Sequence, residues 1–177
     1  MKCLGHDASS RWLSGMGIDI VEHRQLRFPD EHETIVLERP AGSLPLNYFA
    51  EALVDWLPQE SDRFIWLSDW ETYPRSQSCI FERIRGSYGE TKPIIESPGH
   101  VFAENNETER GLYAGLLFLV MAFDWSGYFL VKGHIDRMHM FDTLIGLTCS
   151  LPDKATEVRE IADKFKLRVV RTECIRR

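Results

Sequence analysis

Four side chains that could bind a metal lie within the segment 134–142. They are two imidazoles and two carboxylates, from His134, Asp136, His139 and Asp142, and such groups hold divalent ions in proteins. However, His134 and His139 are five residues apart, a spacing that separates them on a helix and puts them on opposite faces of a strand. The number and spacing of the ligands therefore argue against a metal site, and we predict none.

His100 is a candidate for acid–base catalysis, because an imidazole titrates close to neutral pH. It lies in the sequence Ser97-Pro-Gly-His-Val-Phe102. Together with Arg75 and Arg83 it could form the site of a small hydrolase or transferase. A catalytic histidine also needs an orienting carboxylate and a nucleophile, and the sequence assigns neither. We favour the competing interpretation, which is a structural histidine beside a Pro-Gly turn.

The chain lacks the short motifs that mark common catalytic and cofactor sites. It contains no phosphate-binding loop, glycine-rich dinucleotide fingerprint, nucleophile elbow, zinc-protease helix or calcium-binding loop in their usual sequence forms. We therefore predict no cofactor and favour a protein without enzymatic activity.

Aromatic and cationic side chains that could form a binding surface follow the predicted strand at 64–67. Trp70, Tyr73 and Arg75 are of the three types that contribute most to protein interfaces. Their immediate neighbours, at positions 68, 69, 71 and 72, are all polar, which favours exposure. We predict that these three residues bind a partner; the alternative is that the aromatic rings belong to the core.

The net charge of −6 is concentrated in the first half of the chain. Residues 18–71 carry twelve Asp and Glu against four Arg, a net charge of −8. This balance disfavours nucleic-acid binding, which needs a basic face, and it suits a partner that is itself basic. Glu51 and Asp55 lie four residues apart on the outer face of a predicted helix, so we include both in the predicted binding surface.

Helical and extended patterns alternate along the 177 residues. We expect helices over 44–57, 76–88, 111–123 and 155–165, and strands over 17–21, 34–37, 64–67, 128–132, 141–149 and 168–175. Between them, 93–102 should be extended with a tight turn at Pro98-Gly99, and 133–139 should be a polar connection. This mixture predicts a single α+β domain over 1–177, with a mixed, largely antiparallel sheet covered by helices and a poorly defined segment at 1–30.

The longest apolar run, at 111–123, is too short to cross a bilayer, which takes roughly 20 residues. We expect it to be the most buried element, with Leu116 and Leu119 in the core. The four cysteines are scattered and form no CxxC pair, and the first residues do not resemble a secretory signal. These features predict a cytoplasmic protein with no membrane association.

One part of the chain carries a recognisable series of short motifs. In order, they are Trp66-Leu-Ser-Asp-Trp70, Tyr73-Pro74, Ser87-Tyr-Gly89, Pro98-Gly-His-Val-Phe102 and Asp124-Trp125. The stretch from Trp66 to Trp125, about a third of the chain, resembles a group of small uncharacterised bacterial proteins. The resemblance implies a bacterial source and no particular activity. Small acidic α+β proteins of this kind include toxin-neutralising immunity proteins, which is an association with a class and not a motif match.

Together these observations predict a non-enzymatic cytosolic protein that binds another, basic protein. An immunity or inhibitor protein that sequesters a basic toxin or nuclease domain would fit. The alternative is the hydrolase or transferase with a site around His100, Arg75 and Arg83. A structural subunit of a homo-oligomer is not separated from the first hypothesis by the sequence.

Overall fold

We describe the protein from a computed structural model, which covers residues 1–29, 32–68, 75–103 and 106–174. Helices and strands are interleaved along these residues. Their order is β1 (Lys2–Leu4), α1 (His6–Ser14), β2 (Asp19–Ile20), the short 3-10 helix η1 (Glu22–Arg24), β3 (Leu26–Arg27), β4 (Glu33–Glu38), α2 (Ser43–Trp56), β5 (Arg63–Leu67), α3 (Arg75–Ser87), β6 (Gly99–Phe102), α4 (Glu107–Ala122), β7 (Gly127–Val131), β8 (Arg137–Phe141), β9 (Leu144–Cys149), α5 (Pro152–Phe165) and β10 (Val169–Cys174).

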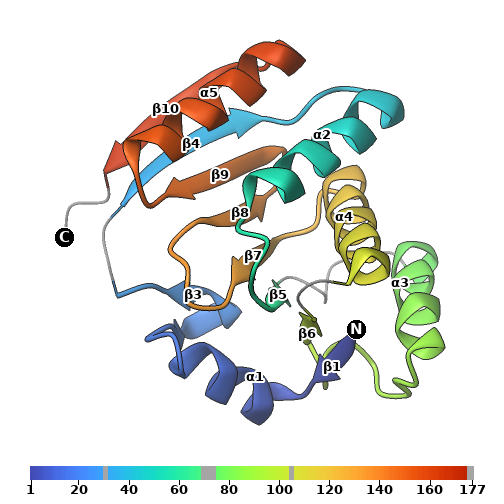
Figure 1. Cartoon of the computed structure of the whole chain (residues 1–177). Helices are drawn as coiled ribbons and strands as arrows, with labels where there is room; N and C mark the ends of the chain where they lie inside the picture. The colour runs from blue at the N-terminus through green and yellow to red at the C-terminus, as the bar shows by residue number, and fades with distance from the viewer. Residues whose placement is uncertain (30–31, 69–74, 104–105, 175–177) are drawn as a thin grey trace.

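Eight of the strands form one sheet, in the order β1-β6-β5-β7-β8-β9-β4-β10 (Figure 1). Each neighbouring pair in this order is antiparallel, and β2 and β3 form a separate small ribbon. The α+β class is confirmed. The sheet is more regular than the mixed arrangement that we expected, because no parallel pair occurs among the described strands.

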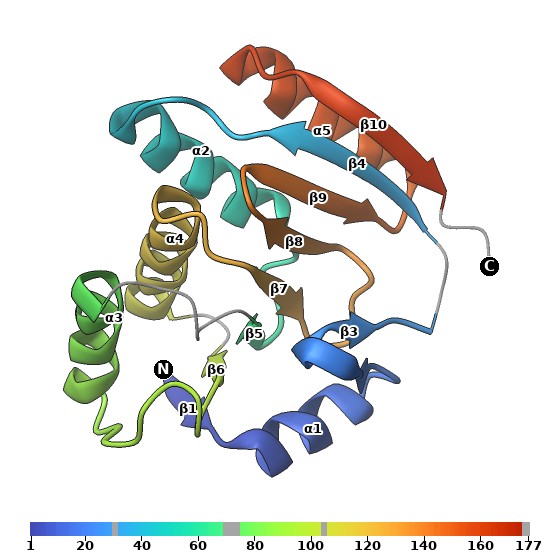
Figure 2. The same ribbon diagram turned by 180° about the vertical axis from the view of Figure 1, so that it is seen from behind.

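The central strands are buried on both faces, as their unbroken apolar sequences predict. In β5, Ile65 and Leu67 face the larger core, which α2, α4 and α5 cover, whereas Phe64 and Trp66 face a second core. Strand β7 alternates in the same way. Figures 1 and 2 show helices α2, α4 and α5 together on one side of the sheet and α1 with β3 on the other.

Residues 1–29 form the cover of this second core, where we expected little regular structure. Leu13 of α1 is fully buried there, and the Trp12 ring stacks on Phe64 with 4.4 Å between centroids. The indole of Trp66 donates a hydrogen bond to the Arg24 carbonyl (2.7 Å). This cover extends over β5, β6 and β7 but leaves the β8, β9 and β4 part of the face open (Figure 2).

Strand β8 corrects two of our expectations. The segment predicted as a polar connection contains Arg137–Phe141, which pairs with β7 and β9, and the strand predicted over 141–149 is interrupted by a hairpin in which Asp142 has a φ of 56°. In β8, Met138 and Met140 enter the core while the polar residues face outward. Because polar residues occupy alternate positions of this half-buried strand, its sequence resembled that of a polar connection.

Two further expectations were wrong. Gly99 does not form a tight turn; it is the first residue of β6 and pairs with Trp66 of β5, and the turn lies at 93–97. Helix α4 is not the most buried element, because β5 and β7 are buried at every position and α4 is not. Leu116 is buried as expected, whereas Leu119 is only partly buried. Among the described helices, none is long and apolar enough to cross a membrane.

Candidate functional site

A groove with a volume of about 680 Å³ runs between α2 and α5. We call it the acidic groove and define it by its rim, which consists of Tyr48, Glu51 and Asp55 from α2 and Glu157, Glu160 and Lys164 from α5. The two helices lie beside each other over the same face of the sheet (Figure 1). The rim therefore carries four carboxylates and one ammonium group.

The amphipathic pattern of each helix places these side chains outward. In α2, the buried stripe includes Leu46, Phe49 and Leu53, so Glu51 and Asp55 project from the opposite side. In α5, Ala155, Val158 and Ala162 are buried, which leaves the acidic residues of the rim exposed. Because the buried stripes of α2 and α5 both pack against the sheet, the exposed acidic residues of the two helices lie along one groove.

The floor of the groove is apolar and is fixed by contacts between the helices. Trp56 is almost fully buried, and its indole donates a hydrogen bond to the Lys154 carbonyl (3.3 Å) while the Lys154 ammonium donates to the Trp56 carbonyl (3.0 Å). Phe49 meets Phe165 edge to face, with 5.2 Å between ring centroids. Because these contacts join α2 to α5, they fix the distance between the two helices and thus between the rim residues that each helix carries.

The four carboxylates differ in how far they are already neutralised. Asp55 pairs with Arg110 of α4, and Glu157 pairs with Lys154 at 2.7 Å. Among the described residues no ion pair includes Glu51 or Glu160. Glu51 accepts a hydrogen bond from the uncharged Asn47 amide (3.3 Å), so the charges of these two carboxylates are the ones on the rim that no ion pair between described residues offsets.

Of the residues predicted from sequence to bind a partner, Glu51 and Asp55 lie together on this rim. Tyr48, which is 56% exposed, joins them, although sequence reasoning missed it. Its position three residues before Glu51 on the outer face of the helix was the available signal. The acidic residues of α5 were missed because only the tertiary structure shows which helix lies beside α2.

The predicted aromatic surface cannot be placed. Trp70 and Tyr73 lie outside the described residues, and Arg75 is described only as the first residue of α3, without its side chain. Arg83 is exposed on α3.

His100 lies in the core and has no exposed surface. Its ring meets Phe81 edge to face at 5.0 Å. Burial, followed by the positive charge of Arg85, lowers the pKa of His100 to about 3, so the imidazole is neutral at physiological pH. Arg85 is itself buried and donates hydrogen bonds to the carbonyl and hydroxyl oxygens of Ser97. A substrate does not reach His100 in this structure, and the exposed Arg83 does not share a site with it.

The candidate metal ligands of segment 134–142 serve separate purposes. The Asp136 carboxylate accepts hydrogen bonds from the backbone N–H and the hydroxyl of Ser150 (2.7 and 3.0 Å). The His139 ring lies parallel to the Tyr128 ring, with 4.2 Å between centroids. His134 and Asp142 are exposed. Within the described residues, no group of three or more His, Cys, Asp and Glu side chains could hold a metal ion.

Comparisons of the chain with protein-family models, with curated proteins and with solved structures found no match.

Proposed function

We propose that the protein is a non-enzymatic binding protein whose acidic groove holds a basic surface of another protein. The observation that carries this proposal is the rim itself, where Glu51 and Glu160 face solvent from two adjacent helices without an ion pair among the described residues. Charges of one sign around a groove attract a partner of the opposite sign and speed its association.

The apolar features of the groove suit a protein partner better than a simple cation. Tyr48 on the rim is more than half exposed, and Leu44, which lies one turn before it on α2 and outside the lining of the groove, is 64% exposed. Exposed tyrosine at the edge of a charged groove is typical of interfaces, because its ring contributes apolar area and its hydroxyl a hydrogen bond. An immunity or inhibitor protein that sequesters a basic toxin or nuclease domain would use such a surface.

The alternative, a hydrolase or transferase at His100, has less support. A general base must come within hydrogen-bonding distance of the substrate, whereas His100 is enclosed by the core and has a pKa of about 3. We therefore do not assign catalysis to this residue.

The test is capture of a partner from the native host, followed by association-rate measurements with charge-reversed variants. We expect Glu51→Lys and Glu160→Lys each to slow association. The native association rate should fall as salt rises, because salt screens exposed charges over a Debye length of about 8 Å at physiological ionic strength. Both residues are exposed, so stability should change by no more than about 0.5 kcal/mol.

Glu82→Lys is the matched control, since Glu82 is an exposed glutamate on α3, which lies away from the groove (Figure 1). It should leave the association rate unchanged. A captured partner whose association is indifferent to salt and to both groove variants, or is slowed equally by Glu82→Lys, would rule out the acidic groove as the binding surface.

A further inference from the structure

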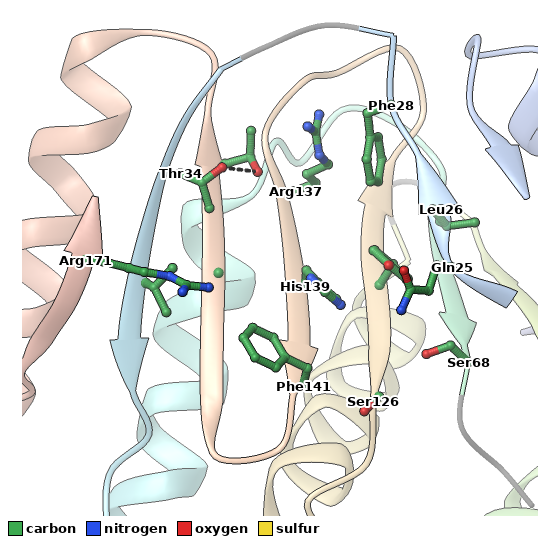
Figure 3. Close-up of a pocket in the computed structure, with 14 residues that line it drawn as sticks. Gln25, Leu26, Phe28, Thr34, Ser68, Ser126, Arg137, His139, Phe141 and Arg171 are labelled. Carbon is green, nitrogen blue, oxygen red and sulfur yellow. Dashed lines mark hydrogen bonds between the residues drawn. The ribbon is translucent and has the colours of Figure 1, made fainter. Parts of the chain in front are cut away.

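The open part of the sheet, on the face opposite the acidic groove, contains a hollow of about 620 Å³. We call it the open-face hollow. Strands β7, β8, β9 and β4 form its floor, the segment from Gln25 to Phe28 forms one wall, and Arg171 of β10 lies at the other side (Figure 3). Its volume lies in the range of sites for small organic molecules.

The hollow exists because one row of residues across the sheet has a gap in the middle. The row runs from Arg171 through Val36, Gly146 and His139 to Tyr128, each being the Cα partner of the next. Gly146 has no side chain to fill the centre. A Cβ added there would meet only ordinary contacts, 3.4 Å from Thr34 Cγ2 and 3.7 Å from the His139 carbonyl oxygen. The glycine is therefore not required by close packing at this point.

Flat rings line the side of the hollow next to this gap. The His139 ring lies parallel to the Tyr128 ring, and the Phe141 ring lies 5.4 Å from the His139 ring at an angle of 29°. Burial, followed by the charge of Arg137, lowers the pKa of His139 to about 4. The imidazole is thus neutral at physiological pH, and these rings give the hollow a flat, uncharged side against which a planar ligand ring can pack.

Two arginines, Arg137 and Arg171, lie beside these rings. Arg137 is held with its guanidinium carbon 3.7 Å from the centre of the Phe28 ring, and it donates a hydrogen bond to the Ile135 carbonyl (3.2 Å). Arg171 extends from β10 across β4 toward the centre of the hollow (Figure 3). No acidic side chain is among the described residues of the lining. The described lining therefore contributes cationic and no anionic side chains, which favours an anionic ligand.

We propose that the open-face hollow binds a small organic anion that carries a planar ring. The ring would stack beside His139 over Gly146, and the anionic group would be held by Arg171, which extends toward the centre of the hollow. Arginine is suited to this role because its planar fork of donors matches carboxylate, sulfonate and phosphate groups. Ser68 and Ser126 at one end of the hollow offer hydroxyl groups for polar substituents of the ring. This inference does not depend on the proposed protein partner, which would dock on the other side of the sheet.

The test uses two fluorescent probes that share the same ring system. Anilinonaphthalene sulfonate carries the anionic group, and N-phenylnaphthylamine lacks it. We expect the sulfonate to bind saturably at one molecule per folded chain, and the neutral amine to bind at least about tenfold more weakly. Arg171→Gln should weaken binding of the sulfonate by about tenfold and leave binding of the amine unchanged. Gly146→Val should prevent both probes from binding, because the valine side chain fills the gap.

The control for Arg171 is Arg168→Gln, which removes the same charge from a neighbouring exposed arginine that pairs with Glu38 outside the hollow. It should leave the affinity for the sulfonate unchanged. Because Arg171 is exposed, its variant is expected to fold and gives a result even if Gly146→Val does not fold. Absence of saturable binding, equal binding of the two probes, or equal effects of Arg171→Gln and Arg168→Gln would each overturn the proposal.

Discussion

Gly99 allows α1 to approach the sheet, and replacing it by alanine should show how much this approach contributes to stability. An added Cβ would overlap the hydroxyl of Ser9 on α1 and would lie 2.9 and 3.0 Å from two ring atoms of Phe64. Ser9 and Phe64 are both fully buried, so neither moves aside without disturbing its neighbours. Forcing extra volume into such a site costs about 1–3 kcal/mol.

The matched control is Gly146→Ala, also a glycine-to-alanine change within a strand of the same sheet. Its Cβ meets nothing closer than 3.4 Å, and the substitution restricts the unfolded chain, so it should stabilise the protein by about 0.4–1 kcal/mol. The two variants should therefore differ in free energy of unfolding by about 1.4–4 kcal/mol. Urea unfolding followed by tryptophan fluorescence is suitable, because Trp12 and Trp66 both lie in the affected core.

A second substitution tests whether Ser9 is the residue that a side chain at position 99 would overlap. Ser9→Ala removes the overlapping oxygen and one hydrogen bond, to the Leu4 carbonyl (3.3 Å), which should cost about 1 kcal/mol alone. Combined with Gly99→Ala, it should cost less than the sum of the two single changes by about 0.5–3 kcal/mol. Equal stability of Gly99→Ala and Gly146→Ala would refute the close approach of α1, and additive effects would refute the role of Ser9.

Two further predictions concern the core. Leu116→Ala should lower the free energy of unfolding by about 2–5 kcal/mol, and Leu119→Ala by clearly less because Leu119 is only partly buried; equal losses in urea unfolding would contradict the packing of α4. The pKa of His100 is about 3 in the folded protein and near 6.5 in the unfolded chain, so its contribution to stability is present above pH 6.5 and is lost as the pH falls toward 3. Between pH 7 and pH 5 the free energy of unfolding should therefore fall less steeply in a His100→Gln variant than in the native protein, and parallel slopes would show that His100 is not the group responsible.

The elements predicted best from the sequence are those whose apolar residues form a clear pattern within the element itself. Helix α2 shows an unbroken stripe of apolar residues, and β5 is an apolar run bounded by polar residues, so local periodicity was enough for both. Strand β8 was missed because Arg137 and His139 face the open side of the sheet, where polar residues are tolerated. Periodicity over five residues is a weak signal when the outward positions include charged and aromatic side chains.

Gly99 shows a different limit of sequence reasoning. A Pro-Gly pair indicates a turn because glycine adopts conformations that other residues avoid. Here the glycine is needed for space, since Ser9, which is 90 residues away in the sequence, approaches it closely. The same distance problem applies to the candidate site: the outer face of α2 was predictable, but its pairing with the acidic residues of α5 depends on how both helices pack on the sheet.

The two proposed binding surfaces are separate because successive side chains of strand β9 lie on opposite faces of the sheet. Ile145 and Leu147 point into the core beneath α2 and α5, whereas Gly146 and Thr148 face the open-face hollow. Because successive side chains of a strand lie on opposite faces, a ligand over Gly146 touches the sheet without displacing the core residues that support the acidic groove. The faces also differ in charge, since four carboxylates surround the groove and two arginines the hollow. A basic protein and a small organic anion would thus each be attracted to a different side of the molecule, and the Glu51 and Gly146 variants should affect only their own ligands.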